Sequence, residues 1–272
     1  MSASQDSGTR LLETMIDAAL EAGRAVHAIY RAGFEVTHKA DQSPVTDADR
    51  AAEAIILASL AQAAPEIPVV AEEEVAAGRV PAVGHEFFLV DPLDGTKEFI
   101  QRRGDFTVNI ALIRAGSPVL GVVYAPANSK LFAGNVAAHA AIRCAADPIS
   151  KAAAARESIR TRQAPASGLT VVASRSHATP GTDAYLSNYT VTERVPIGSS
   201  LKFCLLAAGE ADLYPRLGPT MEWDTAAGHA VLVAAGGSVW APGGVPLKYG
   251  KPGFRNSYFV ASGSLLPAPL VP

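Results

Sequence analysis

Apolar residues in the first quarter of the chain recur at the spacing of helices. Within residues 9–31 they return every three or four positions with charged residues between them, as on a helix that buries one face. Residues 46–63 repeat this pattern, with Thr46 and Asp49 placed as in a capping box and Pro65 just beyond the end. The sequence therefore predicts two amphipathic helices before residue 65.

After residue 65 the pattern changes to short runs of the β type, separated by turns. Residues 114–118, RAGSP, divide two of these runs as a hairpin turn would. Consecutive strands with short connections favour a largely antiparallel sheet, and we expect the two helices to flank it. The runs are at residues 67–71, 86–91, 106–113, 118–125 and 130–134.

The second half of the chain alternates between strand-like and helix-like segments. Before it, residues 145–168 are small, polar and proline-bearing, which indicates a boundary between two subdomains. We therefore expect subdomains at 1–147 and 148–272, the second with a mixed sheet covered by helices, and an α+β fold class. Strands are expected near 169–174, 190–196, 211–215, 236–240 and 258–262, and helices near 179–188, 199–209 and 224–235.

Composition limits the classes of function. The 272 residues are 49% hydrophobic, enough for a substantial core, and a net charge of −3 lacks the basic excess that binding a nucleic-acid polymer requires. Cys144 and Cys204 stand far apart, so the sequence suggests neither a disulfide framework nor a zinc site. Because no apolar signal or membrane-spanning run is present, we expect a cytoplasmic protein; peripheral contact with the inner membrane stays open.

Acidic residues follow two of the predicted strands at the point where each strand ends. Residues 72–74 are all glutamate, and the apolar run ending at Val90 is followed by Asp91 and Asp94, with Gly95 for the turn. Carboxylates that converge in this way repel one another unless a cation or a proton lies between them. Magnesium prefers such oxygen ligands, and no histidine or cysteine accompanies them as zinc would favour. The alternative for the glutamate run, taken alone, is a solvated loop.

A third acid, Asp224, stands at the start of a long apolar helix pattern. Its simplest role is to cap that helix. Because the N-terminus of a helix also favours a bound phosphate, a capping role and a functional role can hold together.

Four strings of the sequence resemble the motifs of the inositol monophosphatase superfamily, in the order that this family has them. They are PVTDAD (44–49), AEE (71–73), DPLDGT (91–96) and WDTAAG (223–228). The combination of the last two is highly specific. The resemblance implies a magnesium-dependent phosphomonoesterase with a layered αβαβα sandwich, in which the N-terminal sheet is mostly antiparallel and the C-terminal sheet is mixed.

Further strings resemble one branch, the bacterial 3′(2′),5′-bisphosphate nucleotidases of the CysQ type. They are DPLDGTKEFI, FTVNIALI, GSSLKFCLLA and LYPRLGPT. This branch implies hydrolysis of the 3′-phosphate of 3′-phosphoadenosine 5′-phosphate (PAP) to AMP and phosphate, in sulfur assimilation. The sulfated nucleotide PAPS, inositol 1-phosphate and fructose 1,6-bisphosphate stay open as substrates, because similar metal ligands serve all of them.

The resemblance also implies roles for single residues. Thr96 orients the attacking water, and either Asp49 or Glu73 takes its proton, although Asp49 also suits a helix cap. Two metal ions can activate the water and stabilise the leaving group. The implied ligands of two Mg²⁺ ions, with a third left open, are Glu72, Asp91, the carbonyl of Leu93, Asp94 and Asp224, most of them in the N-terminal subdomain.

Substrate contacts are expected from hydroxyl, amide and cationic groups. Ser199, Ser200 and Lys202, at the start of a predicted helix, suit the second phosphate of a nucleotide bisphosphate. The further candidates are Gly95, Thr96, Arg175, His177 and Arg216. Homodimer formation stays open.

Two other classes of protein compete with this interpretation. Aspartyl-phosphate phosphatases carry a DxDGT string, but here two residues separate the aspartates, which argues against their nucleophile geometry. A non-catalytic metal or nucleotide sensor is the other class, and the intact set of acids counts against it.

Overall fold

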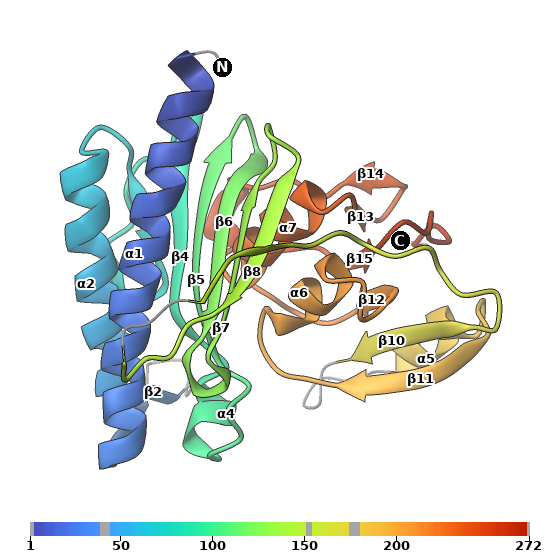
Figure 1. Ribbon diagram of the computed structural model, residues 1–272, viewed down its shortest axis with the longest axis horizontal. Helices are drawn as coiled ribbons and strands as arrows, with labels where there is room; N and C mark the ends of the chain where they lie inside the picture. The colour runs from blue at the N-terminus through green and yellow to red at the C-terminus, as the bar shows by residue number, and fades with distance from the viewer. Residues whose placement is uncertain (1–2, 39–43, 151–153, 174–179, 271–272) are drawn as a thin grey trace.

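The structure is a computed structural model that describes residues 3–38, 44–150, 154–173 and 180–270, arranged in five layers (Figure 1). Helices α1 and α2 cover one face of a seven-stranded sheet, and α6 and α7 lie between that sheet and a six-stranded one, with α5 beyond it. The expected αβαβα sandwich of the α+β class is confirmed.

The two N-terminal helices form where the apolar spacing predicted them. α1 spans Ala3–Ala32, longer than predicted at its start, and α2 spans Asp47–Ala63. The capping box of α2 is present, because the Thr46 hydroxyl accepts a hydrogen bond from Ala48 N and Asp49 accepts one from Thr46 N. Their apolar faces pack on the first sheet.

The first sheet has the strand order β3-β4-β5-β6-β7-β8-β9, and only its β3–β4 pair is parallel. The expectation of a mostly antiparallel sheet is therefore confirmed. Its last two strands were not predicted. The bounds are β3 Val69–Ala71, β4 Glu86–Asp94, β5 Thr107–Arg114, β6 Ser117–Ala125, β7 Lys130–Asn135, β8 Ala140–Ala145 and β9 Glu157–Ser158.

The second sheet has the order β11-β10-β12-β15-β13-β14 and is mixed, as expected, because β10 pairs in parallel with β11 and β12 while the other pairs are antiparallel. Its bounds are β10 Leu169–Ala173, β11 Val191–Pro196, β12 Leu213–Arg216, β13 Ser238–Ala241, β14 Val245–Pro246 and β15 Phe259–Ser262. The helices of this half are α5 Pro180–Leu186, α6 Leu201–Ala207 and α7 Ala226–Ala234.

Short elements surround the ends of β3 and β4. A small hairpin of β1 and β2 precedes α2, α3 follows β3 directly, and α4 follows β4 after one glycine. Only α4 was anticipated, as the helix beginning TKEFI. The bounds are β1 Val36–His38, β2 Pro44–Thr46, α3 Glu72–Ala76 and α4 Thr96–Ile100.

One hydrophobic cluster joins the two halves of the chain. It contains Phe87 and Leu89 from β4 together with Phe203 from α6 and Val231 from α7. Since β9 extends the first sheet beyond residue 147, the division into subdomains at that residue stays a prediction. None of the described helices has the length and apolarity needed to cross a membrane.

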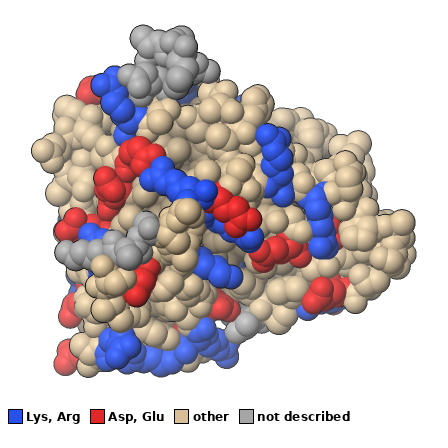
Figure 2. Space-filling model, in the orientation of Figure 1, with Lys and Arg blue, Asp and Glu red and all other residues tan. Residues whose placement is uncertain are grey.

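In Figure 2, charged side chains of both signs lie side by side across the middle of the face, Lys and Arg side chains gather along its lower edge, and much of the rest is uncharged. Because the net charge is −3, the protein has no broad positive surface, and an anionic ligand would have to be bound by a local group of Lys and Arg side chains.

Candidate active site

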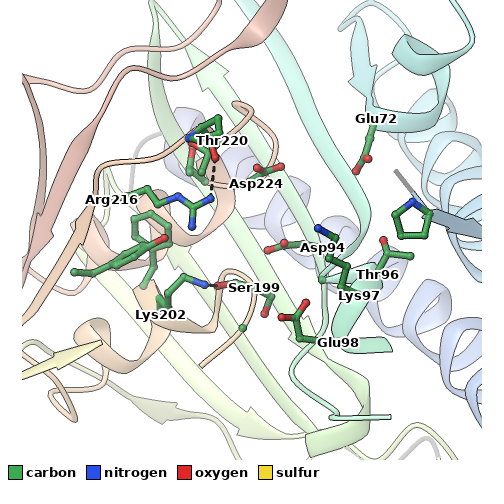
Figure 3. A pocket seen from close by; sticks show the side chains of 17 residues that line it. Glu72, Asp94, Thr96, Lys97, Glu98, Ser199, Lys202, Arg216, Thr220 and Asp224 are labelled. Atoms are coloured by element: carbon green, nitrogen blue, oxygen red, sulfur yellow. Dashed lines mark hydrogen bonds between the residues drawn. The ribbon is translucent and has the colours of Figure 1, made fainter. Parts of the chain in front are cut away.

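A cleft of about 260 Å³ opens where β4, α4, α6 and α7 meet (Figure 3). It brings together residues from both halves of the chain. The predicted site residues that line it are Glu72, Asp94, Gly95, Thr96, Ser199, Lys202, Arg216 and Asp224.

The acids reach this cleft from three places in the chain. Glu72 is the first residue of α3, and Asp94 is the last residue of β4, where the pairing with β5 becomes irregular after Asp91. Gly95 then turns the chain with a φ of 93°, in the left-handed region that favours glycine. Asp224 lies just before α7, and its Oδ2 accepts a hydrogen bond of 2.9 Å from Met221 N.

Burial makes Asp94 and Asp224 hard to ionise, and also Asp91, which is buried and does not line the cleft. Burial, and then repulsion from Glu72, Asp94 and Asp224, raises the pKa of Asp91 well above its ordinary value. Burial, followed by repulsion from Asp94 and Glu72, raises the pKa of Asp224 to about 8. The pKa of Asp94 is raised as well, chiefly by burial. A bound cation would relieve both the burial cost and the repulsion.

Thr96 and Asp49 form a hydrogen-bonded pair at the edge of the cleft. The Oδ2 atom of buried Asp49 accepts hydrogen bonds from the backbone N (2.7 Å) and hydroxyl (2.8 Å) of Thr46. Thr96 Oγ1 lies 3.3 Å from Asp49 Oδ1 and 3.2 Å from the carbonyl oxygen of Leu93. Because a hydroxyl has one hydrogen, Thr96 donates to one of these at a time and keeps its lone pairs as acceptors.

Two buried cations lie on the side of the cleft away from Glu72 and Thr96 (Figure 3). Lys202 Nζ donates to the carbonyl oxygens of Ser199 at 2.6 Å and Ile197 at 3.4 Å, and burial lowers its pKa to about 8. Arg216 donates from one terminal nitrogen to the carbonyl oxygen of Pro219 at 2.8 Å. Its Nε is buried and has no hydrogen-bond partner among the described residues.

A sequence model of the inositol monophosphatase family matches residues 8–264. The chain belongs to this family. It is 44% identical over 257 residues to the 3′(2′),5′-bisphosphate nucleotidase CysQ of Escherichia coli strain K12, which covers 92% of this chain and 100% of that relative. The CysQ of Salmonella typhimurium is 45% identical with the same coverage. The resemblance of the motifs to the family and to its CysQ branch is therefore confirmed.

Solved structures of the inositol monophosphatase family share the fold. CysQ from Bacteroides thetaiotaomicron matches with a TM-score of 0.78 and 38% identity, over 94% of this chain and 98% of that one. An inositol monophosphatase from Anabaena matches with a TM-score of 0.73 and 26% identity, over 94% and 92% of the two chains.

Enzymes of the inositol monophosphatase family depend on magnesium, and the donor set of this cleft suits that ion. Glu72, Asp94 and Asp224 point into it from different elements (Figure 3), and they supply only hard oxygen atoms. Within the described part of the chain, no three acidic, histidine or cysteine side chains are grouped closely enough to count as a formed metal site. The acids surround the cleft but do not converge on one point.

Glu73 faces a different cavity. It lines a second cleft with Glu53, Glu74 and Arg79, and its backbone N donates to Glu53 Oε2 at 2.9 Å. The structure thus brings Asp49, and not Glu73, beside Thr96. Burial raises the pKa of Glu53 to about 7. Glu53 is not among the predicted site residues, although its place one turn after Asp49 on the buried face of α2 is a usable signal.

Of the other predicted substrate residues, Ser199 lines the cleft but Ser200 does not. The Ser200 side chain is buried, and its hydroxyl donates to the carbonyl oxygen of Asp224 at 2.7 Å. Arg175 and His177 lie outside the described residues. Glu98, Tyr214 and Thr220 also line the cleft and were missed.

Proposed function

We propose that this protein is a magnesium-dependent 3′(2′),5′-bisphosphate nucleotidase that converts PAP to AMP and phosphate. The observation that supports this most is a single cleft that is lined by Glu72, Asp94 and Asp224 and that also contains the buried cations Lys202 and Arg216. A metal site and a separate cationic site suit a substrate with two phosphates. Relatives named as bisphosphate nucleotidases, 44% identical over nearly the whole chain, support the same choice.

In this proposal acids in and next to the cleft would hold the metal. Carboxylate oxygens and one backbone carbonyl would bind two magnesium ions, with a third left open. When bound there, magnesium supplies positive charge that neutralises the phosphate and lowers the pKa of the attacking water. The proposed ligands are Glu72, Asp91, Leu93 through its carbonyl, Asp94 and Asp224.

The chain's own residues then position the water and take its proton. Thr96 accepts a hydrogen bond from the water, because its own hydrogen is directed to Asp49 or Leu93. The proton passes through the Thr96 hydroxyl to Asp49 Oδ1, while Oδ2 stays bonded to Thr46. Glu73 is the second choice as base, since its side chain lines the other cleft.

The second phosphate is assigned to the cationic side of the cleft. Arg216 offers its unpartnered Nε, Lys202 adds charge, and Ser199 adds a hydroxyl. The amides of Gly95 and Thr96 are candidate donors to the phosphate that is removed. The sulfated nucleotide PAPS fits the same arrangement. We further propose a role in sulfur assimilation and a cytoplasmic location; contact with the inner membrane and homodimer formation stay open.

Other substrates of the family fit this cleft less well. Inositol 1-phosphate has no second phosphate, so it would leave Lys202 and Arg216 without an anionic partner. Fructose 1,6-bisphosphate has two phosphates and is the nearer alternative. A non-catalytic sensor would not need the Thr96–Asp49 pair beside the acids.

Phosphate release from PAP by purified protein with magnesium tests the proposal. We expect AMP as the nucleotide product, and we expect Asp94→Asn to lower the rate by about 100-fold or more, because it removes a charged ligand. Glu74→Gln is the matched control, since this acid is ion-paired with Arg79 outside the cleft. Failure to hydrolyse PAP, or full activity of Asp94→Asn, would contradict the proposal.

A further inference from the structure

Asn109 has a buried amide side chain that contacts Asp94, one of the cleft acids, from outside the cleft. It lies on β5, has no solvent exposure and does not line the cleft. Its Nδ2 is 3.3 Å from Asp94 Oδ2 and 3.0 Å from Ser200 Oγ. One amide group therefore donates to Asp94 and to a serine of the other half of the chain.

Ser200 extends this contact to the second half of the site. Its backbone N donates to Asp94 Oδ2 at 2.7 Å, and its hydroxyl donates to the carbonyl oxygen of Asp224 at 2.7 Å. Asn109 and Ser200 thus form a polar bridge from the end of β4 to the start of α7. With Oδ2 held by two donors, the Asp94 carboxylate has little freedom to rotate.

The orientation of the Asn109 amide follows from its neighbours. If the amide were flipped, its oxygen would face the carboxylate of Asp94, and two acceptors would oppose each other. In the observed orientation Oδ1 is buried and has no hydrogen-bond partner among the described residues. An unpaired buried acceptor is destabilising by about 1–3 kcal/mol, so stability alone gives a poor reason for an amide here.

We propose that Asn109, acting with Ser200, is a positioning residue that fixes the Asp94 carboxylate and its distance from Asp224 for cation binding. This inference rests on the proposed metal role of those two acids. Partners of this kind behind metal ligands commonly change metal affinity by about 10–100-fold when they are removed. The role is carried out through Asp94, because Asn109 itself does not reach the cleft.

Magnesium affinity of the protein without substrate, measured by calorimetric titration, tests the inference. We expect Asn109→Leu, which keeps the branched shape of the side chain but is larger and has no amide, and Asn109→Ala to bind magnesium about 10–100-fold more weakly than the unmodified chain. Thr107→Val is the matched control. Thr107 lies on the same face of β5, and its buried Oγ1 has no hydrogen-bond partner in the described part of the chain. The magnesium affinity of the Thr107→Val variant should therefore equal that of the unmodified chain.

The outcomes separate this inference from the proposed function. If the unmodified chain binds magnesium and both Asn109 variants bind it equally well, the inference is overturned and the proposed function stands. If Asn109→Leu alone recovers the affinity, packing and not the amide is responsible, which also overturns it. If the unmodified chain binds no magnesium, the proposed function falls together with the inference. The melting temperature in a chelator, together with the titration stoichiometry, identifies any variant that fails to fold.

Discussion

At the scale of single residues, the cleft contains two buried cations, Lys202 and Arg216, for which the described residues show no direct ion pair, although Asp94, Glu98 and Asp224 lie near enough to attract Lys202. Lys202 donates to two backbone carbonyls, and Arg216 has a buried Nε without a partner among the described residues. A buried cation is costly unless it is paired with an anion. Two such cations beside one cleft therefore indicate an anionic ligand that completes them.

The contribution of Arg216 can be measured by comparing two substrates. We expect Arg216→Ala to raise the KM for PAP by about 10–100-fold, because a charge-assisted hydrogen bond contributes about 1.5–3 kcal/mol. The KM for adenosine 3′-monophosphate, which lacks the second phosphate, should change much less. Arg194→Ala is a control, since Arg194 is an exposed residue paired with Asp183. Equal changes for both substrates would show that Arg216 does not contact the second phosphate.

Part of the site could be predicted from single residues, and part could not. Asp91, Asp94 and Glu72 were recognisable because acids directly after apolar strands are unlike ordinary surface acids. Asn109 carried no such signal, because its partners come from β4 and from the start of α6, far away in the sequence. Only the pairing of strands and the packing of the two halves bring them together.

At the scale of elements, the close approach of α7 to the first sheet determines where Asp224 lies. A Cβ at Gly121 of β6 would lie 2.7 Å from Ala230 Cβ and would also clash with the carbonyl oxygen of Ala227. A Cβ at Gly134 of β7 would lie 2.7 Å from Val231 Cα. The absence of side chains at these two positions allows the helix backbone to lie directly on the strands.

We therefore expect Gly121→Ala to destabilise the protein by about 1–3 kcal/mol, because the added methyl forces α7 away from the sheet. The free energy of unfolding in urea measures this change. Gly84→Ala is the control, since no heavy atom lies within 4 Å of the Cβ position there and the loop is open. A Gly121→Ala variant as stable as the control would contradict this account of the packing.

The start of α3 depends on Glu53, which accepts the hydrogen bond from Glu73 N. Its folded pKa of about 7 exceeds the ordinary value of 4.5, mainly through burial. The carboxyl is protonated in the folded and unfolded chain below pH 4.5. Stability that its neutral form contributes is therefore lost as the pH rises through 7.

We expect Glu53→Gln to have nearly the stability of the unmodified chain at pH 4.5 and to be more stable at pH 8 by about 1–2 kcal/mol. This difference in the free energy of unfolding is smaller than the pKa shift alone would imply, because nearby water and salt screen part of the repulsion. Urea unfolding at both pH values, in a chelator, measures it. A difference that does not grow with pH would rule out the raised pKa.

Elements with strong patterns were predictable, and weakly patterned ones were not. The long helices and strands β4 to β7 match their apolar periodicity closely. The sequence did not predict β8, β9 or the β1–β2 hairpin, because these strands are short and many of their residues are small or polar. Such strands form because a neighbouring strand offers free backbone groups, which local sequence does not reveal.

At the scale of the whole molecule, the site exists only because two halves of the chain close on each other. The first sheet and its short helices supply Glu72 and Asp94, while α7 and the second half supply Asp224 and the cations. The shared hydrophobic cluster holds the halves together. Arg143 of β8 adds ion pairs with Glu157 and with Glu210 of the second half.

The central claim is that this cleft selects a nucleotide with two phosphates. The most direct test is a competition between equal concentrations of PAP and inositol 1-phosphate with magnesium, in which the consumption of both is followed together. We predict that PAP is hydrolysed at least about 10-fold faster, since its second phosphate gains charge-assisted hydrogen bonds that inositol 1-phosphate cannot make. Faster hydrolysis of inositol 1-phosphate would contradict the claim and leave Lys202 and Arg216 without their assigned role.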